Sequence, residues 1–284
     1  MRTPCLAYFA PIRGEAVPKL SMAMTSTELT PTQARQRARR FRQMPTLRCK
    51  TEEDIRDFVN EVGVCMLFPA TGFELPNVYQ AVAGFAKPQS DSHSDPTNSL
   101  TWRTKDAMLD KRWWYYGKLI RNKATLVSLS LFPAFYALSE NFGEDDDYLQ
   151  LFADGKLSVD ARGVYEALLT KGPMHAIQLK RESNFYGEEK KAKFDRAMSE
   201  LQTKLMVMSV GVAEAGAWRY AYIYDTVHRW LPEQVAAARS LSRSQARTKI
   251  ARQHLQNVIV CPPKELARLF GWTLAEAEKA VSAA

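Results

Sequence analysis

The sequence predicts an α+β protein, mostly α, built from tandem winged-helix and helix-turn-helix units with short β-hairpins. Three observations lead to this fold class. Apolar residues recur at helical spacing through most of the chain after residue 51, and strand-like alternation is confined to short stretches. Residues 156–232 place three predicted helices before two strands that a glycine-containing turn joins. Three helices followed by a hairpin is the element order of a winged-helix domain.

Chain length and charge distribution limit the possible functions. The 284 residues, 46% of them hydrophobic, are enough for two or three small domains with apolar cores. The formal net charge is +8, but residues 1–44 hold eight Lys or Arg and two acids, and so contribute +6 of it. The remaining chain is close to neutral overall. Any argument for a nucleic-acid partner therefore depends on local basic patches.

A basic leader and an N-terminal domain are the first two predicted units. Residues 1–43 are expected to be poorly ordered and to end in a basic arm, "TPTQARQRARRFRQ", that is predicted to be helical; Met44 is an alternative natural start. Residues 44–155 are expected to form a winged-helix-like domain. It opens with a helix for which Thr51 is the N-cap, and apolar residues follow at i, i+3, i+4 and i+7 from Ile55. The next stretch, "GVCMLF", predicts a short buried strand.

Four consecutive aromatic residues, "WWYY" at 113–116, stand between basic residues. Four adjacent side chains cannot all enter one core, because a strand alternates between two faces and a helix sweeps around all of them. Two rings are expected to pack inward, and the neighbouring basic residues to face a nucleic-acid groove; packing of the whole run between domains is the alternative. The residues of this segment predicted to contact DNA are Trp114, Lys118, Arg121 and Lys123.

Residues 156–232 form the predicted winged-helix domain. In such a domain the third helix enters the major groove and the hairpin forms the wing. The predicted third helix carries basic residues away from its apolar stripe, although four acids lie among them. The candidate DNA contacts are Lys190, Lys191 and Lys193 on this helix and Trp218 and Arg219 at the wing tip. The alternatives are a protein-contact role for the domain and hairpin packing for Trp218.

Residues 233–284 are predicted to form a C-terminal helix-turn-helix unit. The stretch "AAARSLSRSQARTKIARQHLQN" has five Lys or Arg and no acid, and it predicts one long helix or a helix pair. Arg239, Arg243 and Arg247 recur every four residues, so on one helix they share a face. Phosphate is the natural partner of such a face, and a merely solvated basic face is the alternative.

Most catalytic and metal-binding patterns are absent from the sequence. It contains no P-loop, G-x-S-x-G or H-E-x-x-H motif, and the four histidines lack ligand spacing. The four cysteines are far apart and form no C-x-x-C pair, which favours a reducing compartment. The longest apolar stretch, 124–138, is too short to span a bilayer. We therefore expect a cytoplasmic protein with no metal, no cofactor and no membrane partner, whose partner is double-stranded DNA.

The sequence resembles the AlkZ/YcaQ-like proteins, winged-helix DNA-binding proteins that include bacterial DNA glycosylases. The resemblance depends on four stretches in order: "TEEDIRDFVNEVGV", "GKLIRNKATLVSLSLFPAFYAL", the segment from "GVYEALLTKGP" to "WRYAYIYDTVHRWLP", and the terminal helix-turn-helix. It implies tandem winged-helix units that form a positively lined DNA surface. It also implies a Gln-x-Gln or Gln-x-Asp catalytic motif just after the opening helix, but this place reads "GVCMLFPATG" and contains no Gln.

The sequence therefore predicts a DNA-binding protein related to the AlkZ-like glycosylases but without their known catalytic motif. One alternative is an active glycosylase that uses a different acid, with Glu74 or Asp54 as the candidate. Another is a transcription regulator or partner-binding protein on the same scaffold. Release of bases from alkylated duplex DNA would separate the first two hypotheses. The third hypothesis would be separated from the first two by whether the basic residues and the aromatic run face one common groove.

Overall fold

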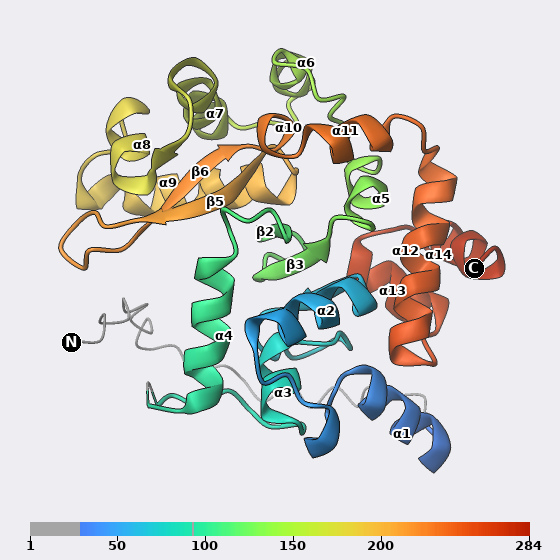
Figure 1. The fold of residues 1–284 in the computed structure, drawn as a ribbon. Coiled ribbons are helices and arrows are strands. Elements are labelled where there is room, and N and C mark those ends of the chain that lie inside the picture. The colour runs from blue at the N-terminus through green and yellow to red at the C-terminus, as the bar shows by residue number, and fades with distance from the viewer. Residues whose placement is uncertain (1–28, 93) are drawn as a thin grey trace, which may run out of the picture.

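The computed structural model describes residues 29–92 and 94–284, and Figure 1 shows its fold. Helices surround two small antiparallel sheets of three strands each. The strand order is β1-β3-β2 in the first sheet and β4-β6-β5 in the second. The predicted fold class, α+β and mostly α, is thereby confirmed at this level. No helix of the described residues is both long and apolar enough to cross a membrane.

The first sheet belongs to the N-terminal half of the chain. The elements of this half are α1 (Pro31–Arg40), a 3-10 turn (Pro45–Leu47), α2 (Glu52–Val62), β1 (Val64–Met66), α3 (Val78–Ala83), α4 (Pro96–Ala107), β2 (Trp114–Gly117), β3 (Thr125–Ser128) and α5 (Phe132–Tyr136). Helix α2 begins as predicted, because Thr51 accepts a hydrogen bond from the Asp54 N–H and the Asp54 carboxylate accepts one from the Thr51 N–H.

The second sheet lies in the middle of the chain, and five helices follow it to the C-terminal end of the described residues. The elements are α6 (Asp147–Ala153), α7 (Val159–Lys171), β4 (Met174–His175), α8 (Ala176–Glu182), α9 (Glu188–Thr203), β5 (Val207–Ala213), β6 (Ala221–Thr226), α10 (Val227–Trp230), α11 (Pro232–Ala238), α12 (Arg243–Val258), α13 (Pro263–Phe270) and α14 (Leu274–Ser282). Three helices thus precede the β5–β6 hairpin, in the predicted order, and β4 adds a strand that the sequence pattern did not indicate.

Three of the four aromatic residues at 113–116 lie on β2, which separates two apolar cores, and Trp113 directly precedes the strand. Trp114 and Tyr116 pack into the core beneath α2, and Tyr115 packs on the opposite side, stacked on Phe132 with ring centroids 5.1 Å apart. Strand alternation therefore buries three of the rings, and only Trp113 stays partly exposed. The prediction that Trp114 contacts DNA is wrong, because this side chain is only 2% exposed.

The helix α1 contradicts part of the expectation for the leader. Its Arg40 guanidinium donates to Asn257 Oδ1 at 3.1 Å, to Glu61 Oε1 at 2.9 Å and to the Glu61 carbonyl at 2.7 Å. These contacts hold α1 against α2 and α12, so residues 29–43 form part of the folded body. The expectation of poor order for residues 1–28 lies outside the described residues.

The basic C-terminal stretch forms two helices. Helix α11 ends at Ala238, and α12 begins after Ser242, whose side chain accepts a hydrogen bond from the Gln245 N–H in a capping box. Arg239 therefore lies in the link between the helices, and the prediction that Arg239, Arg243 and Arg247 share one helical face is wrong. In Figure 1, α12 to α14 (orange to red) lie beside α5 and α2.

Candidate nucleic-acid interface

The loop between β2 and β3 closes through a tight two-residue turn. The Lys123 N–H donates to the Ile120 carbonyl at 2.9 Å, and the two central residues, Arg121 and Asn122, have φ angles of 51° and 56°. Both angles lie in the left-handed region that a type I′ hairpin turn requires. Side chains other than glycine adopt this conformation at some cost, so the turn holds Arg121 in a conformation that an arginine seldom takes.

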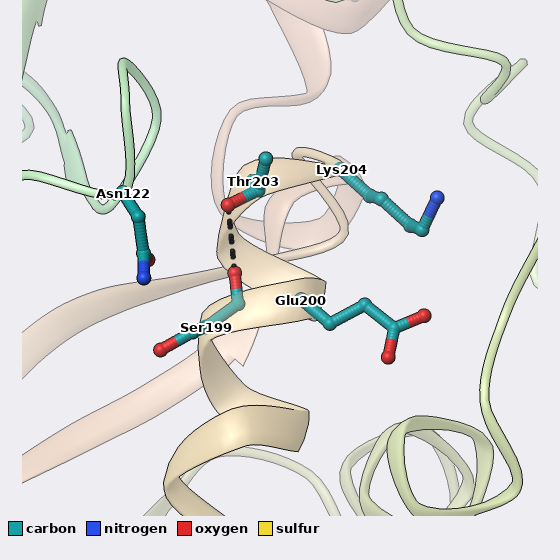
Figure 2. A pocket seen from close by; sticks show the side chains of 5 residues that line it. All are labelled: Asn122, Ser199, Glu200, Thr203 and Lys204. Atoms are coloured by element: carbon teal, nitrogen blue, oxygen red, sulfur yellow. Dashed lines mark hydrogen bonds between the residues drawn. The ribbon is translucent and has the colours of Figure 1, made fainter.

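This turn lies against helix α9. Lys118 Nζ donates to Ser199 Oγ at 3.0 Å, the Lys118 N–H donates to Gln202 Oε1 at 2.9 Å, and Thr203 Oγ1 donates to the Lys118 carbonyl at 3.0 Å. Figure 2 shows Asn122 facing the last turns of α9 across a shallow cavity of about 230 Å³. Lys118 thus joins the N-terminal half of the chain to the third helix, and its ammonium group is partly used for that contact.

The opposite end of α9 carries the predicted lysines. Lys191 and Lys193 are exposed, and Lys190 is half-buried, with its Nζ 3.1 Å from the Asn184 carbonyl. Lys190 lies about 13 Å along the helix from Ser199, at 1.5 Å per residue. Arg196, which the sequence analysis left out of the candidate contacts, is also exposed and lies one turn before Ser199. The basic side chains of α9 therefore begin at its first turn and extend to the β2–β3 turn.

Of the four acids on α9, only Glu200 is directed away from the basic residues to a partner on another element. The Glu200 carboxylate accepts hydrogen bonds from the Ser158 N–H at 3.0 Å and from the Ser158 hydroxyl at 2.6 Å. It therefore lies at the N-terminus of α7, where the helix dipole favours negative charge. Glu188 and Glu189 are exposed in the first turn of α9, where the helix dipole favours negative charge, and Asp195 is exposed beside Arg196, so these three acids reduce the net positive charge of the helix.

The β5–β6 hairpin extends from the body at the left of Figure 1. Its loop holds Trp218, which is 61% exposed, and Arg219, which has a φ angle of 50° and pairs with Glu214. Hairpin packing as the role of Trp218 is therefore wrong. An indole that the fold leaves in solvent is available for contact with a partner.

A buried lysine fixes the hairpin to helix α4. The Lys105 side chain is 0% exposed and pairs with Asp106, and its Nζ donates to the hydroxyls of Tyr220 (3.1 Å) and Tyr222. The Tyr220 hydroxyl in turn donates to Asp106 Oδ1 at 2.8 Å. Burial lowers the pKa of Lys105, and the adjacent Asp106 carboxylate opposes this shift. The orientation of the hairpin therefore depends on contacts with the N-terminal half.

Two arginines of the C-terminal stretch have internal partners. Arg239 pairs with Glu144 at 2.5 Å, and Arg247 pairs with Glu276 at 2.5 Å. Each of these side chains therefore already has an internal counter-charge, and the expectation that they contact DNA stays a prediction. Arg243 is exposed at the first turn of α12 and has no carboxylate within 4.0 Å among the residues that the structure describes.

A second cavity, of about 320 Å³, lies beside the β2–β3 turn. Its lining consists of residues 71–73, Arg121, Lys123, Arg268 and Leu269. Arg268 donates to the Gly72 carbonyl at 2.7 Å, and Arg121 Nη1 lies 3.5 Å from the Arg268 carbonyl. Arg268 was not predicted as a site residue, because it is a single basic residue near the end of α13 with no sequence pattern that indicates a partner.

The segment that follows the opening helix is apolar, as the sequence indicated. Cys65, Met66 and Leu67 are all buried, on or directly after β1. Of the two alternative acids, Asp54 serves the N-terminus of α2, where N–H groups of Lys50 and Thr51 lower its pKa. The Glu74 side chain is 62% exposed and lies 3.6 Å from Arg37, outside the lining of both cavities.

The described part of the chain also lacks a cluster of side chains suited to a metal ion. There, no group of three or more His, Cys, Asp or Glu side chains has the arrangement needed to hold a metal ion. The three cysteines among these residues are free.

Comparison with known proteins identifies a family that this chain matches. The model of a family described as AlkZ related matches residues 49–271, which include β1, the β2–β3 turn, α9, the β5–β6 hairpin and α13. No curated protein and no solved structure matches the chain. The match extends over more than half of the chain and includes the first three stretches that carried the resemblance and the first helix of the fourth. The chain therefore belongs to the AlkZ-related family.

Proposed function

We propose that the protein binds double-stranded DNA through the exposed face of α9, the tip of the β5–β6 hairpin and the β2–β3 turn. One observation carries the proposal. The exposed basic residues of α9, Lys191, Lys193 and Arg196, have no carboxylate within 4.0 Å in residues 29–92 and 94–284, whereas Arg239 and Arg247 do. Unpaired cations on one helix are suited to phosphate oxygens, which release counterions when they are neutralised.

The order of the elements supports the same role. The sequence α7, β4, α8, α9, β5, β6 with sheet order β4-β6-β5 fits a winged-helix domain, in which α9 would be the recognition helix and the hairpin the wing. On this reading the lysines of α9 meet the backbone beside the major groove, and Trp218 and Arg219 meet the sugar-phosphate or the minor groove. We also propose that the chain contains tandem winged-helix units. A role in DNA repair would agree with membership of the AlkZ-related family.

Base excision is not part of the proposal. Removal of a base requires a group that activates water or stabilises the developing sugar cation. Buried apolar side chains occupy the place of the family's motif, Asp54 caps a helix, and Glu74 lies beside Arg37. DNA binding alone accounts for the exposed basic residues of α9.

The test is the salt dependence of duplex binding, measured by fluorescence anisotropy with a short labelled duplex. The variant Lys191→Gln/Lys193→Gln removes two charges from α9. The matched control Lys249→Gln/Lys264→Gln removes two exposed charges from the C-terminal helices. We expect the α9 variant to lower the slope of log K against log salt by about 1.8 and the control to leave it unchanged. Equal slopes for the two variants would refute the assignment of α9.

The single variant Arg243→Gln tests whether α12 joins the interface. A slope that falls by about 0.9 would extend the surface to the C-terminal helices. An unchanged slope would restrict it to α9, the hairpin and the turn.

A further inference from the structure

The cavity beside the β2–β3 turn brings together cations that the sequence keeps far apart. Arg121 and Lys123 come from the turn and Arg268 comes from α13, so 145 residues separate Lys123 from Arg268. No acidic side chain lines the cavity, and none of the three cations has a carboxylate within 4.0 Å across the described ranges. Glu74, the acid closest in sequence to the 71–73 segment, lies outside the lining and beside Arg37 instead.

One of the three cations is held in place by a backbone contact, and the backbone of a second is fixed by the turn. Arg268 is fixed by its hydrogen bond to the Gly72 carbonyl at 2.7 Å, and the tight turn holds the backbone of Arg121. Three like charges around one cavity repel each other unless an anion lies between them. A site whose donors are already oriented gives up less side-chain entropy when it binds a ligand.

The chemistry of the lining favours phosphate among anions. Two guanidinium groups offer planar pairs of donors that match phosphate oxygens, and Lys123 adds a third charge. The cavity volume of about 320 Å³ is larger than one phosphate group fills, and Phe73 and Leu269 form an apolar part of its wall. A ligand that carries a phosphate next to an apolar or aromatic group would therefore use more of the site than an inorganic ion.

We propose that this cavity binds one phosphate group, and that in the complex with DNA this group is a backbone phosphate. The second part of the inference depends on the proposed function, and the first part does not. The cavity and α9 lie on two sides of the same turn, because Asn122 faces α9 while Arg121 and Lys123 line the cavity. The cavity therefore adds a phosphate contact outside the winged-helix segment and fixes the register of the duplex on the protein.

The first test uses inorganic phosphate and the amide resonances of the ¹⁵N-labelled full-length chain. Titration with sodium phosphate at constant ionic strength should shift the amide signals of Thr71, Gly72 and Lys123 along a saturating curve, and titration with sodium chloride should not. The variant Lys123→Gln should weaken phosphate binding about tenfold. The control Lys249→Gln, an exposed lysine on α12, should leave it unchanged. Non-saturating shifts, or equal shifts with chloride, would overturn the proposal.

The second test uses the labelled duplex and distinguishes the sources of the phosphate. Lys123→Gln should lower the salt slope of duplex binding by about 0.9. If phosphate saturates the cavity but Lys123→Gln leaves the slope unchanged, the nucleic-acid source is overturned, and the site takes a small phosphorylated molecule. If the protein binds no duplex while phosphate still saturates the cavity, the proposed function fails and the phosphate site stands.

Discussion

Replacing Lys105 by methionine should destabilise the protein by about 2–3 kcal/mol and loosen the β5–β6 hairpin. The ammonium group of Lys105 has no solvent contact, and it is held by Asp106 and by the hydroxyls of Tyr220 and Tyr222. It also lies 4.6 Å from the ring centroids of both Trp102 and Tyr222. Methionine has a similar length and adapts well to its surroundings, so the substitution removes the charge with little change in packing.

The magnitude follows from two contributions that lower stability and two that oppose them. Removing one partner of a buried ion pair costs about 3–5 kcal/mol, and a desolvated cation–π contact adds about 1–2 kcal/mol. The Asp106 side chain is 23% exposed, so water solvates the carboxylate that remains and reduces the loss. Burial also disfavours the charged form of Lys105 and lowers its pKa, and methionine removes this penalty. The net effect is therefore smaller than the sum of the lost contacts.

Urea unfolding measures the free energy of unfolding of each variant. Amide hydrogen exchange of residues 207–226 measures how readily the β5–β6 hairpin opens. The control Lys111→Met removes an exposed lysine that lies 5.3 Å from the Trp113 ring, and it should change stability by less than about 0.5 kcal/mol. A Lys105→Met protein that is as stable as the wild type would refute the reasoning. Such a result would mean that the desolvation penalty of the buried charge equals the energy of its contacts.

Burial lowers the pKa of His254 from 6.5 to about 4, so the unfolded chain binds a proton there before the folded chain does. The free energy of unfolding, measured in urea titrations, should therefore fall by about 3 kcal/mol as pH drops from 6.5 through 4. This pH dependence should vanish in His254→Leu. It should persist in the control His175→Asn, which retains an N-cap for α8. Wild-type protein incubated with alkylated duplex DNA should yield no abasic sites; release of bases that Glu74→Gln abolishes would identify Glu74 as catalytic instead. Trp218→Ala should leave the melting temperature unchanged, since this side chain is mostly exposed, but should lower duplex affinity roughly tenfold in anisotropy measurements. Unchanged affinity would remove the hairpin tip from the interface.

Local signals in the sequence were sufficient to predict several elements. Thr51 is the N-cap of α2, as expected, and Asp54 completes a capping box there. The apolar stripe of α9 and the β5–β6 hairpin lie within the predicted winged-helix segment. These features depend on residues three or four positions apart or on strand alternation, so a short window of sequence contains the whole interaction.

The sequence did not reveal which side chains meet across the fold. Regular spacing suggested one arginine face from 239 to 247, but Ser242 starts a new helix there, and carboxylates from distant segments neutralise Arg239 and Arg247. Nor did composition distinguish Trp114, which enters a core, from Trp218, which stays in solvent.

The sequence alone determined the helical and strand periods, the N-cap of α2, the hairpin turn of the 156–232 segment and the apolar character of the segment after the opening helix. Only the tertiary structure brought Arg268 to Arg121 and Lys123, and enclosed Lys105 between α4 and the hairpin. The physical reason is that periodicity decides which face of an element a residue occupies, whereas packing between distant elements decides what that face meets. A lysine or arginine looks the same in the sequence whether its partner is water, an internal carboxylate or an external phosphate.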